Sequence, residues 1–332
     1  MTDLRYNLCM ILACYLIVIN LLTFVIYGVD KNKARKGKWR LSEAFLIFLA
    51  VFFCGSIGAL LGMLIWHHKT RKPKFYVTVP IFAVLHTAGI IFCLYQNYNL
   101  TVTQYDADIG LGRDLTIVQI SDLHNQFFGI NESILLDRIR EQDPDMIVVT
   151  GDVVDSFHTS YAIAEDFFAG AVEICPVYYI TGNHEVRLYG SRFDEFISKI
   201  TSMGVMYLDD SYIEIEDLVI AGIADESLWS FEAFEPFDDG QNVIMLAHEP
   251  RYVTLYQSLG ADLVLTGHIH GGQFIIPGKG GMLSPEFEFF PELYDGIHDF
   301  DGMKLIVSRG LGNSAVPVRI NNFPEIVVVK VH

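Results

Sequence analysis

The heptapeptide GHIHGGQ, residues 267–273, decides how the second half of this chain is interpreted. It follows the apolar run ADLVLT at 261–266, so His268 and His270 come directly after a predicted buried strand. The flanking glycines permit sharp backbone turns, through which both imidazoles can approach one point. The pattern indicates a site at a strand end and directs attention to the ends of the other strands.

Four more short apolar runs, rich in Val and Ile, predict buried strands at 114–121, 146–150, 177–181 and 243–247. Amphipathic segments at 131–142 and 191–204 predict helices, so the region is an α/β layered domain. Strand-like segments follow one another after Val205, which predicts a partly antiparallel or mixed sheet. Polar residues lie just past these four strands, at the edge where open α/β sheets bind ligands: Asp122, His124, Asp152, Asn183 and His248.

The residue types at the strand ends predict a metal site. Imidazole with carboxylate and amide oxygen, without a thiolate, suits divalent Mn, Fe, Co or Zn. One catalytic zinc uses about three protein ligands, so seven candidates predict two ions with a bridging carboxylate. A lone DLH, GD or His248 would be an ordinary turn or a structural histidine, and only the ordered set carries the prediction. GKGG at 278–281 lacks the spacing of a phosphate-binding loop.

Charge divides the chain near residue 100. Residues 1–100 hold 11 basic and three acidic side chains, a net of +8, whereas residues 101–332 hold 12 and 37, a net of −25. The acidic part offers no basic stripe, so nucleic acid is not an expected partner. Four of the five cysteines lie in apolar runs of the basic part, and Cys175 alone cannot form a disulfide within the acidic part.

The basic part contains three apolar runs, which predict about three transmembrane helices at 8–27, 44–66 and 76–96. The domains are therefore expected at 1–97 and 98–332, in an integral plasma-membrane protein. A re-entrant middle segment is the alternative, but Gly55, Gly58 and Gly62 are expected to allow close helix packing. With three spans the flanking loops carry six Lys/Arg on one side and five on the other, which leaves the orientation open.

The first section resembles a short bacterial membrane family of unknown function over roughly residues 15–92. The resemblance rests on YG-x-DK at 27–31, WR-x-SE at 39–43, G-x-x-GA at 55–59 and HKT at 68–70. Cys54 departs from the pattern, since a second glycine is usual there. The match implies a membrane module and no chemistry.

The acidic part resembles the calcineurin-like metallophosphoesterases over roughly residues 114–332, on the ordered motifs D-x-H, GD-x-x-D, GNHE, H and GH-x-H. The resemblance implies a four-layer α-β-β-α sandwich with mixed sheets. One metal would be held by Asp122, His124, Asp152 and His270. The other would be held by Asp152, Asn183, His248 and His268. His184 would act on the phosphoryl group, Asp155 would orient it, and Glu185 stays outside the predicted site.

These motifs predict a membrane-anchored, dinuclear metal-dependent phosphoesterase, in which a metal-bridging hydroxide attacks a phosphate mono- or diester. Manganese is one candidate metal, and a lipid-linked or envelope-associated substrate is expected. GGQ at 271–273 and NNFPEI at 321–326 resemble an anchored or exported bacterial branch, which favours an extracytoplasmic catalytic domain. Ser156 stands where protein phosphatases carry arginine, which disfavours phosphoproteins. A weakly catalytic binding module and a membrane transporter or sensor regulated by this domain are the alternatives.

Overall fold

The computed structural model describes residues 4–225, 235–238, 240–313 and 318–332. The chain forms two compact units, residues 1–95 and 96–332, and each is described by itself. The apolar helix α5 (Thr78–Tyr98) passes from the first unit into the second, so its last turn belongs to the second.

The first unit consists of helices α1 (Leu4–Arg35), α2 (Glu43–Val51), α3 (Ser56–Ile65), α4 (Pro73–Tyr76) and most of α5. Two helical stretches in the described residues, Ala13–Arg35 and Pro73–Tyr98, are long and apolar enough to cross a bilayer. The single span predicted over 44–66 is wrong, because the chain breaks there between α2 and α3. At ~1.5 Å per residue, nine or ten residues reach only about half of the ~30 Å hydrocarbon layer.

Asn20 of α1 holds the break between α2 and α3. Its Nδ2 donates to the Cys54 carbonyl (3.0 Å) and its Oδ1 accepts from the Gly58 N–H (2.8 Å). A Cβ added at Gly58 would lie 1.9 Å from the Asn20 carbonyl oxygen, so only glycine permits this approach of α3 to α1. The close packing expected of the glycines is present, together with the helix break that was not expected.

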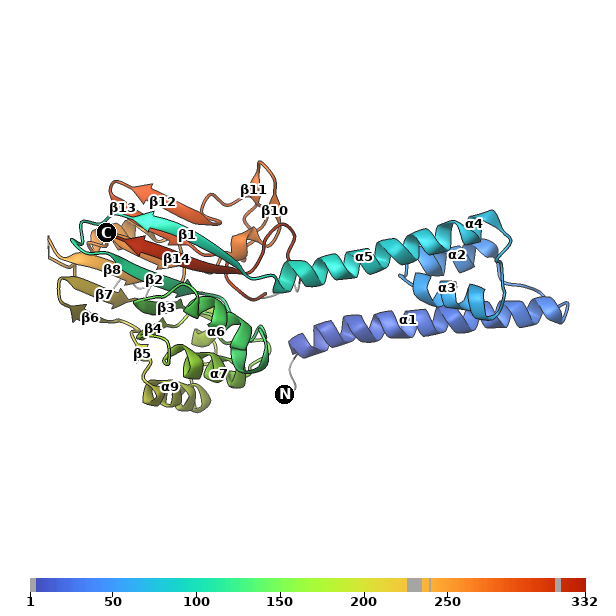
Figure 1. The fold of residues 1–332 in the computed structure, drawn as a ribbon, viewed down its shortest axis with the longest axis horizontal. Coiled ribbons are helices and arrows are strands. Elements are labelled where there is room, and N and C mark those ends of the chain that lie inside the picture. Colours follow the sequence, from blue (N-terminus) through green and yellow to red (C-terminus); the bar gives the residue numbers. More distant parts are fainter. Residues whose placement is uncertain (1–3, 226–234, 239, 314–317) are drawn as a thin grey trace. The chain divides into compact units, whose positions relative to one another are not determined.

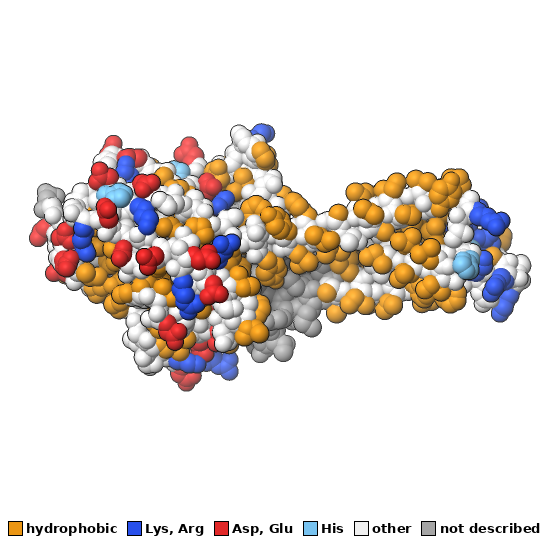
Figure 2. All heavy atoms as spheres, viewed as in Figure 1, with side chains coloured by type: hydrophobic (Ala, Val, Ile, Leu, Met, Phe, Trp, Pro, Cys, Tyr) orange, Lys and Arg blue, Asp and Glu red, His pale blue; other side chains and the backbone are white. Residues whose placement is uncertain are grey.

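Motif residues of the first unit bond to one another at one end of it. The buried Asp30 carboxylate accepts from Arg40 (3.3 Å) and pairs with His68 (2.8 Å). Glu43 pairs with Lys69 (2.8 Å) and also contacts Lys72 and Lys74. These bonds place the loops at 36–42 and 66–72 together, and Figure 2 shows a group of Lys and Arg side chains at that end of the unit.

The second unit is built on two six-stranded mixed sheets (Figure 1). The first has the order β1 (Thr101–Ala107), β14 (Glu325–Val331), β2 (Leu115–Ile120), β3 (Met146–Thr150), β4 (Val177–Ile180), β5 (Met206–Tyr207). The second has the order β12 (Gly296–Phe300), β13 (Met303–Val307), β9 (Leu263–Thr266), β8 (Asn242–Leu246), β7 (Leu218–Gly222), β6 (Ser211–Ile215). A small hairpin, β10 (Ile275–Ile276) and β11 (Gly280–Gly281), follows β9.

The two sheets pack face to face and helices cover their outer faces. Ile117, Val148 and Ile180 of the first sheet share one buried core with Ile244, Leu246 and Leu265 of the second. Helices α6 (Ser133–Arg140), α7 (Tyr161–Ala171) and α9 (Ser191–Met203) pack on the first sheet. Helix α10 (Val253–Ser258) packs on the second. The four-layer α-β-β-α sandwich is confirmed.

Strand register places all the predicted site residues at one edge of the sandwich. Strands β2, β3 and β4 are parallel, as are β8 and β9, so their carboxyl ends point the same way within each sheet. A bond from Gln119 Nε2 to the Thr266 carbonyl (2.8 Å) joins the end of β2 to the end of β9. We call this edge, at residues 120–124, 150–156, 181–186, 247–249 and 266–273, the ligand edge.

Candidate metal centre

The backbone at the ligand edge turns sharply directly after each strand. Five of the seven candidate ligands have left-handed φ angles between 45° and 71°: Asp122, His124, Asp152, His268 and His270. Such conformations cost on the order of 1 kcal/mol or more for a residue with a Cβ, and they concentrate at functional sites. The strain brings these side chains to one place.

Two glycines leave the space that this convergence needs. A Cβ added at Gly267 would lie 2.4 Å from Asp122 Oδ2, and one at Gly151 would lie 2.8 Å from His248 Nδ1. Gly151 also has a φ of 87°, which side chains disfavour. Glycine therefore lets ligand loops from different strands approach closely, as the sequence predicted.

One cluster at the edge consists of the buried residues Asp122, His124 and His270. Their facing atoms are Asp122 Oδ1 and the two Nε2 atoms. The nitrogens lie 3.1 Å apart, and Asp122 Oδ1 is 3.6 Å from His270 Nε2 and 3.9 Å from His124 Nε2. Three potential ligand atoms thus face one another within the reach of one cation.

A second cluster consists of Asp152, His248 and His268. Asp152 Oδ2 lies 3.3 Å from His248 Nε2, which is 3.2 Å from His268 Nδ1. The same carboxylate oxygen lies 3.4 Å from His124 Nε2 of the first cluster. Asp152 therefore stands between the two clusters, where a bridging ligand would stand.

The Asn183 amide adds a potential ligand to the second cluster. One of its amide atoms lies 2.9 Å from Asp152 Oδ2 and 3.3 Å from His248 Nε2. If this atom is the amide nitrogen, it donates to both neighbours. If it is the amide oxygen, it meets Asp152 Oδ2 and His248 Nε2 as a third atom with a lone pair, and a cation shared by the three stabilises the arrangement. The donor set of carboxylate, imidazole and amide thus fits divalent metals.

Two of the four clustered histidines have a hydrogen-bond partner for the ring nitrogen that faces away from the clusters, and the corresponding nitrogen of a third, His124, faces a carboxylate. His248 Nδ1 contacts the Thr150 carbonyl oxygen (2.8 Å). His124 Nδ1 lies 3.5 Å from Asp155 Oδ2, and His268 Nε2 contacts Glu286. Such partners fix the tautomer and aim the other nitrogen at a metal. Glu286 follows its histidine by 18 residues in a loop, where no spacing rule reveals it.

His184 lies beside the first cluster, and its ring centroid is 4.6 Å from that of His124. Its Nδ1 accepts from the Ser156 N–H (3.1 Å), so Nε2 carries the proton of the neutral ring. Burial lowers the pKa of His184 to about 3, which keeps the ring neutral. The expected partner Asp155 lies farther away, with Oδ1 3.8 Å from the same nitrogen.

Glu185, which the sequence interpretation left outside the site, ties two ligand loops together. Its buried Oε2 accepts from the Asp152 N–H (2.8 Å) and the Gly182 N–H (2.9 Å), and its Oε1 accepts from the Val154 N–H (2.8 Å). The carboxylate thereby fixes the loop that carries Asp152 against the loop that carries Asn183. A lone carboxylate after a histidine gives no sequence signal for this role.

At the centre of the ligand edge, Asp152 and His248 each stabilise the charged form of the other. Burial alone would raise the pKa of Asp152. The surrounding imidazoles lower this pKa by a larger amount, so that it lies well below its ordinary value. Burial lowers the pKa of His248, but the Asp152 charge overcomes this and raises it well above its ordinary value. The cluster therefore attracts positive charge, which a proton or a metal cation can supply.

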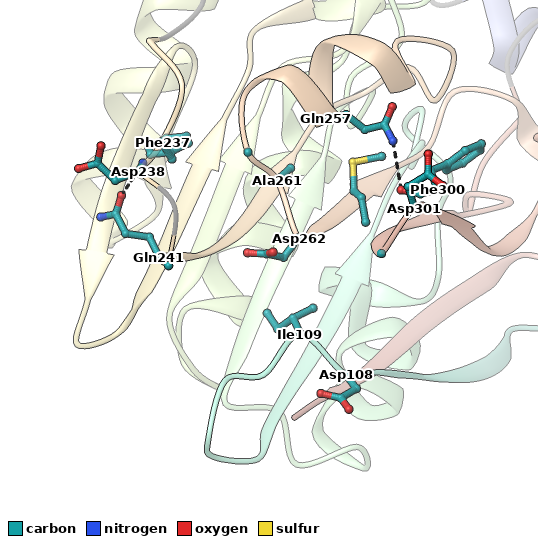
Figure 3. A pocket seen from close by; sticks show the side chains of 14 residues that line it. Asp108, Ile109, Phe237, Asp238, Gln241, Gln257, Ala261, Asp262, Phe300 and Asp301 are labelled. Carbon is teal, nitrogen blue, oxygen red and sulfur yellow. Dashed lines mark hydrogen bonds between the residues drawn. The ribbon is translucent and has the colours of Figure 1, made fainter.

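A hollow in the described part of the second unit lies at the edge opposite the ligand edge. Figure 3 shows this cavity of about 520 Å³, with Gln241 before β8 and Asp262 before β9 in its wall. Its described lining contains four aspartates and no Lys, Arg or His. Such a lining repels anions, so the cavity does not suit a phosphate ester. The aspartates are Asp108, Asp238, Asp262 and Asp301.

Comparison with known proteins assigns both units to families. Residues 115–272 match the calcineurin-like phosphoesterase family, and residues 20–75 match DUF1294, a family of unknown function. The chain is 28% identical over 308 residues to the uncharacterized metallophosphoesterase Cj0846 of Campylobacter jejuni, covering 86% of this chain and 77% of that one.

Two further relatives each match one part of the chain. The uncharacterized protein YsdA of Bacillus subtilis is 42% identical over 91 residues, covering 27% of this chain and all of YsdA. The phosphodiesterase YaeI of Escherichia coli is 26% identical over 223 residues, covering 64% of this chain and 81% of YaeI. The chain therefore carries a calcineurin-like metallophosphoesterase domain, of a family of metal-dependent phosphoester hydrolases, after an N-terminal DUF1294 domain.

Proposed function

We propose that the protein is a membrane-anchored phosphoesterase with two divalent metal ions, acting on a lipid-linked or envelope-associated phosphoester. The main support is the convergence of Asp122, His124 and His270 with Asp152, His248 and His268 at one strand edge. Asp152 stands between the two groups, within 3.4 Å of His124 and 3.3 Å of His248.

The proposed ligand sets follow this geometry. One ion would be held by Asp122, His124, Asp152 and His270, and the other by Asp152, Asn183, His248 and His268, so that Asp152 would belong to both sets. Manganese, iron, zinc and cobalt all suit these donors. When bound, the ions supply Lewis acidity, which lowers the pKa of water and neutralises phosphoryl charge.

The residues around the ligands orient the substrate. His184, neutral and with its proton on Nε2, donates a hydrogen bond to a phosphoryl or leaving oxygen. Arg187 brings positive charge near it, since its guanidinium lies 5.9 Å from the Phe157 ring, which in turn packs 5.5 Å from the His184 ring. Asp155 is proposed to position His124, its nearer neighbour, while the Ser156 N–H orients His184.

The sidedness proposal rests on the broken middle segment of the first unit. Because α2 and α3 turn back, the loops at 36–42 and 66–72 lie at the same end. Ten Lys/Arg from residues 31–40 and 69–74 then flank the two spans on one side, against Arg5 on the other. The positive-inside rule assigns the ten to the cytoplasm, so a chain that crosses along α5 carries its phosphoesterase domain outside.

The first experiment measures manganese-dependent hydrolysis of bis(p-nitrophenyl) phosphate and p-nitrophenyl phosphate by the full chain in detergent. Hydrolysis that chelation abolishes and manganese restores supports the enzyme, and the faster ester indicates diesterase or monoesterase preference. A folded chain that hydrolyses neither ester with any of the four metals contradicts it and favours a binding module.

Sidedness has a separate test. We expect alkaline phosphatase fused after His332 to be active and a fluorescent protein at the same place to be dark, because alkaline phosphatase needs an oxidising compartment. The opposite pair of results would place the catalytic domain in the cytoplasm.

A further inference from the structure

Apolar side chains of the second unit are exposed around the ligand edge. Phe127 and Ile130 follow the cluster residue His124 and are 48% and 78% exposed, and Phe157, two residues after Asp155, is 63% exposed. Phe287 and Phe289, on the loop after β11, are 78% and 69% exposed. We call these five side chains, four phenylalanines and one isoleucine, the aromatic rim. A group of exposed large apolar side chains marks a surface that binds a membrane, a protein or a ligand.

The loop that carries Phe287 and Phe289 is tied directly to the candidate metal centre. The Leu283 N–H donates to the Gly272 carbonyl (3.0 Å), two residues after His270. Leu283 and Phe289 form an antiparallel bridge, which closes the loop into a hairpin. Glu286, at its tip, contacts His268. The loop therefore has a defined conformation that holds both phenylalanines exposed beside the site.

The apolar helix α5 enters the second unit at the same edge. In the strand pairing, Thr101 at the start of β1 lies opposite Glu325, and Val327 lies opposite Gln119 near the end of β2. The start of β1 is thus level with the carboxyl end of β2, where the ligands follow. Only residues 99 and 100 separate α5 from β1.

Contacts within the second unit fix this entry point. Asn97, in the last turn of α5, is 9% exposed and its Oδ1 accepts from the Arg319 N–H (3.1 Å). The Tyr98 ring packs 6.5 Å from the Phe128 ring, in the loop that follows His124. The residues at the end of the apolar helix are therefore anchored beside the ligand loops of the second unit.

We propose that the aromatic rim contacts the lipid bilayer and seats the metal centre at the lipid–water interface, where it meets the phosphate of a membrane amphiphile. This inference rests on the proposed function and narrows its substrate to lipids whose apolar chains stay in the membrane. The acidic cavity at the opposite edge, with four aspartates, keeps that end in water. Phenylalanine and isoleucine partition into the acyl region, whereas acidic side chains are excluded from it.

Depth in the bilayer provides the first test. The full chain is reconstituted in phosphatidylcholine vesicles with or without dibrominated acyl chains, and quenching by the bromines is compared for Phe287→Trp and Glu173→Trp. Glu173 is exposed and lies before β4, at the opposite edge. After subtraction of the three native tryptophans, we expect at least twofold stronger quenching for Phe287→Trp. Equal, weak quenching at both positions would overturn the proposal and leave a protein or soluble partner as the occupant of the rim.

Substrate choice provides the second test. In the same vesicles, the ratio of phosphatidic acid hydrolysis to bis(p-nitrophenyl) phosphate hydrolysis is measured for the parent, for Phe287→Ser/Phe289→Ser, and for Tyr212→Ser, which removes an aromatic half exposed on β6. We expect the double variant to lower the ratio at least tenfold and Tyr212→Ser to keep it within about twofold. An unchanged ratio in the double variant overturns the proposal, and a parent without soluble-ester hydrolysis instead contradicts the proposed function.

Discussion

Two buried aspartates show how the two units use the same chemical groups differently. Asp30 of the first unit meets donors at both oxygens: Oδ1 accepts from the Leu41 N–H (2.8 Å) and Oδ2 pairs with Arg40 and His68. Asp152 of the second unit accepts from the His184 N–H at Oδ1, but its Oδ2 faces two imidazole nitrogens and an amide. A carboxylate surrounded by donors stabilises a fold, whereas one that faces other ligand atoms is arranged for a cation.

The largest effect that separates the two aspartates should come from Asp152→Asn. We expect kcat/KM for bis(p-nitrophenyl) phosphate to fall about 10³-fold or more, equivalent to ~4 kcal/mol of transition-state stabilisation, because the bridging charge is lost. Asp262→Asn, at the opposite edge, is the matched control and should stay within about twofold. Equal activity of parent and Asp152→Asn would remove Asp152 from the site.

Asp30→Ala should have the converse outcome, with stability lost and chemistry kept. Removal of the carboxylate leaves Leu41 N–H and His68 without their buried partner, which costs about 3 kcal/mol. Thermal unfolding in detergent, followed with a thiol-reactive dye, measures this loss because four of the five cysteines lie in residues 1–95. Lys38→Ala should leave the transition unchanged. A loss of soluble-ester activity in folded Asp30→Ala would mean that the first unit takes part in the reaction.

His184→Asn distinguishes residues that hold metal from residues that hold substrate. We expect kcat to fall about 10²-fold while the metal content is unchanged, because His184 is assigned to substrate oxygen. Ser156→Ala removes a hydroxyl that lies 3.2 Å from His184 Nδ1 but keeps the backbone N–H that donates to the same nitrogen, so its kcat should change less than threefold. If His184→Asn lost its metal, His184 would have to be counted among the ligands.

Glu132 has a different hydrogen-bond environment from either aspartate. Both of its carboxylate oxygens contact the same donor, the Phe128 N–H (3.1 and 3.2 Å). Burial raises its pKa from 4.5 to about 7, so between these pH values the folded state keeps a proton that the unfolded state has lost. Stability therefore falls as pH rises through this window.

Glu132→Gln removes that penalty. We expect the variant to exceed the parent in free energy of unfolding by about 1–2 kcal/mol at pH 8 and to match it near pH 4.5, as measured by urea unfolding. A difference that was the same at both pH values, or larger in acid, would show that the Glu132 charge is not the cause.

The sequence predicted most of the second unit because each strand there is short, apolar and ended by a polar residue. The four layers followed from a resemblance, and the strand-end residues do converge. The sequence could not supply the contacts that depend on loop conformation, such as Glu286 on His268 and the three N–H groups on Glu185. Glu286 lies on a loop and Glu185 in the single helical turn α8 (Asn183–Val186), and neither segment is long enough to show a periodic pattern.

The first unit was predicted less well because hydropathy detects an apolar segment but does not detect a break in the helix within it. The run 44–66 is apolar throughout, yet it contains a break whose carbonyl at Cys54 is satisfied by Asn20, more than 30 residues away. The motif residues Asp30, Arg40 and His68 were recognised as a family pattern, but only the structure shows that they bond to one another. The error mattered, because it divided the basic loops between two sides.

The most direct test of the central claim is a count of metal ions bound to the full chain. The purified protein is titrated with manganese after chelation, and bound metal per chain is measured by elemental analysis for the parent and for Asp152→Asn. We predict close to two ions per chain in the parent and one or fewer in the variant, with activity appearing as the second ion binds. A folded parent that binds none, or that is fully active with one, would contradict the dinuclear centre.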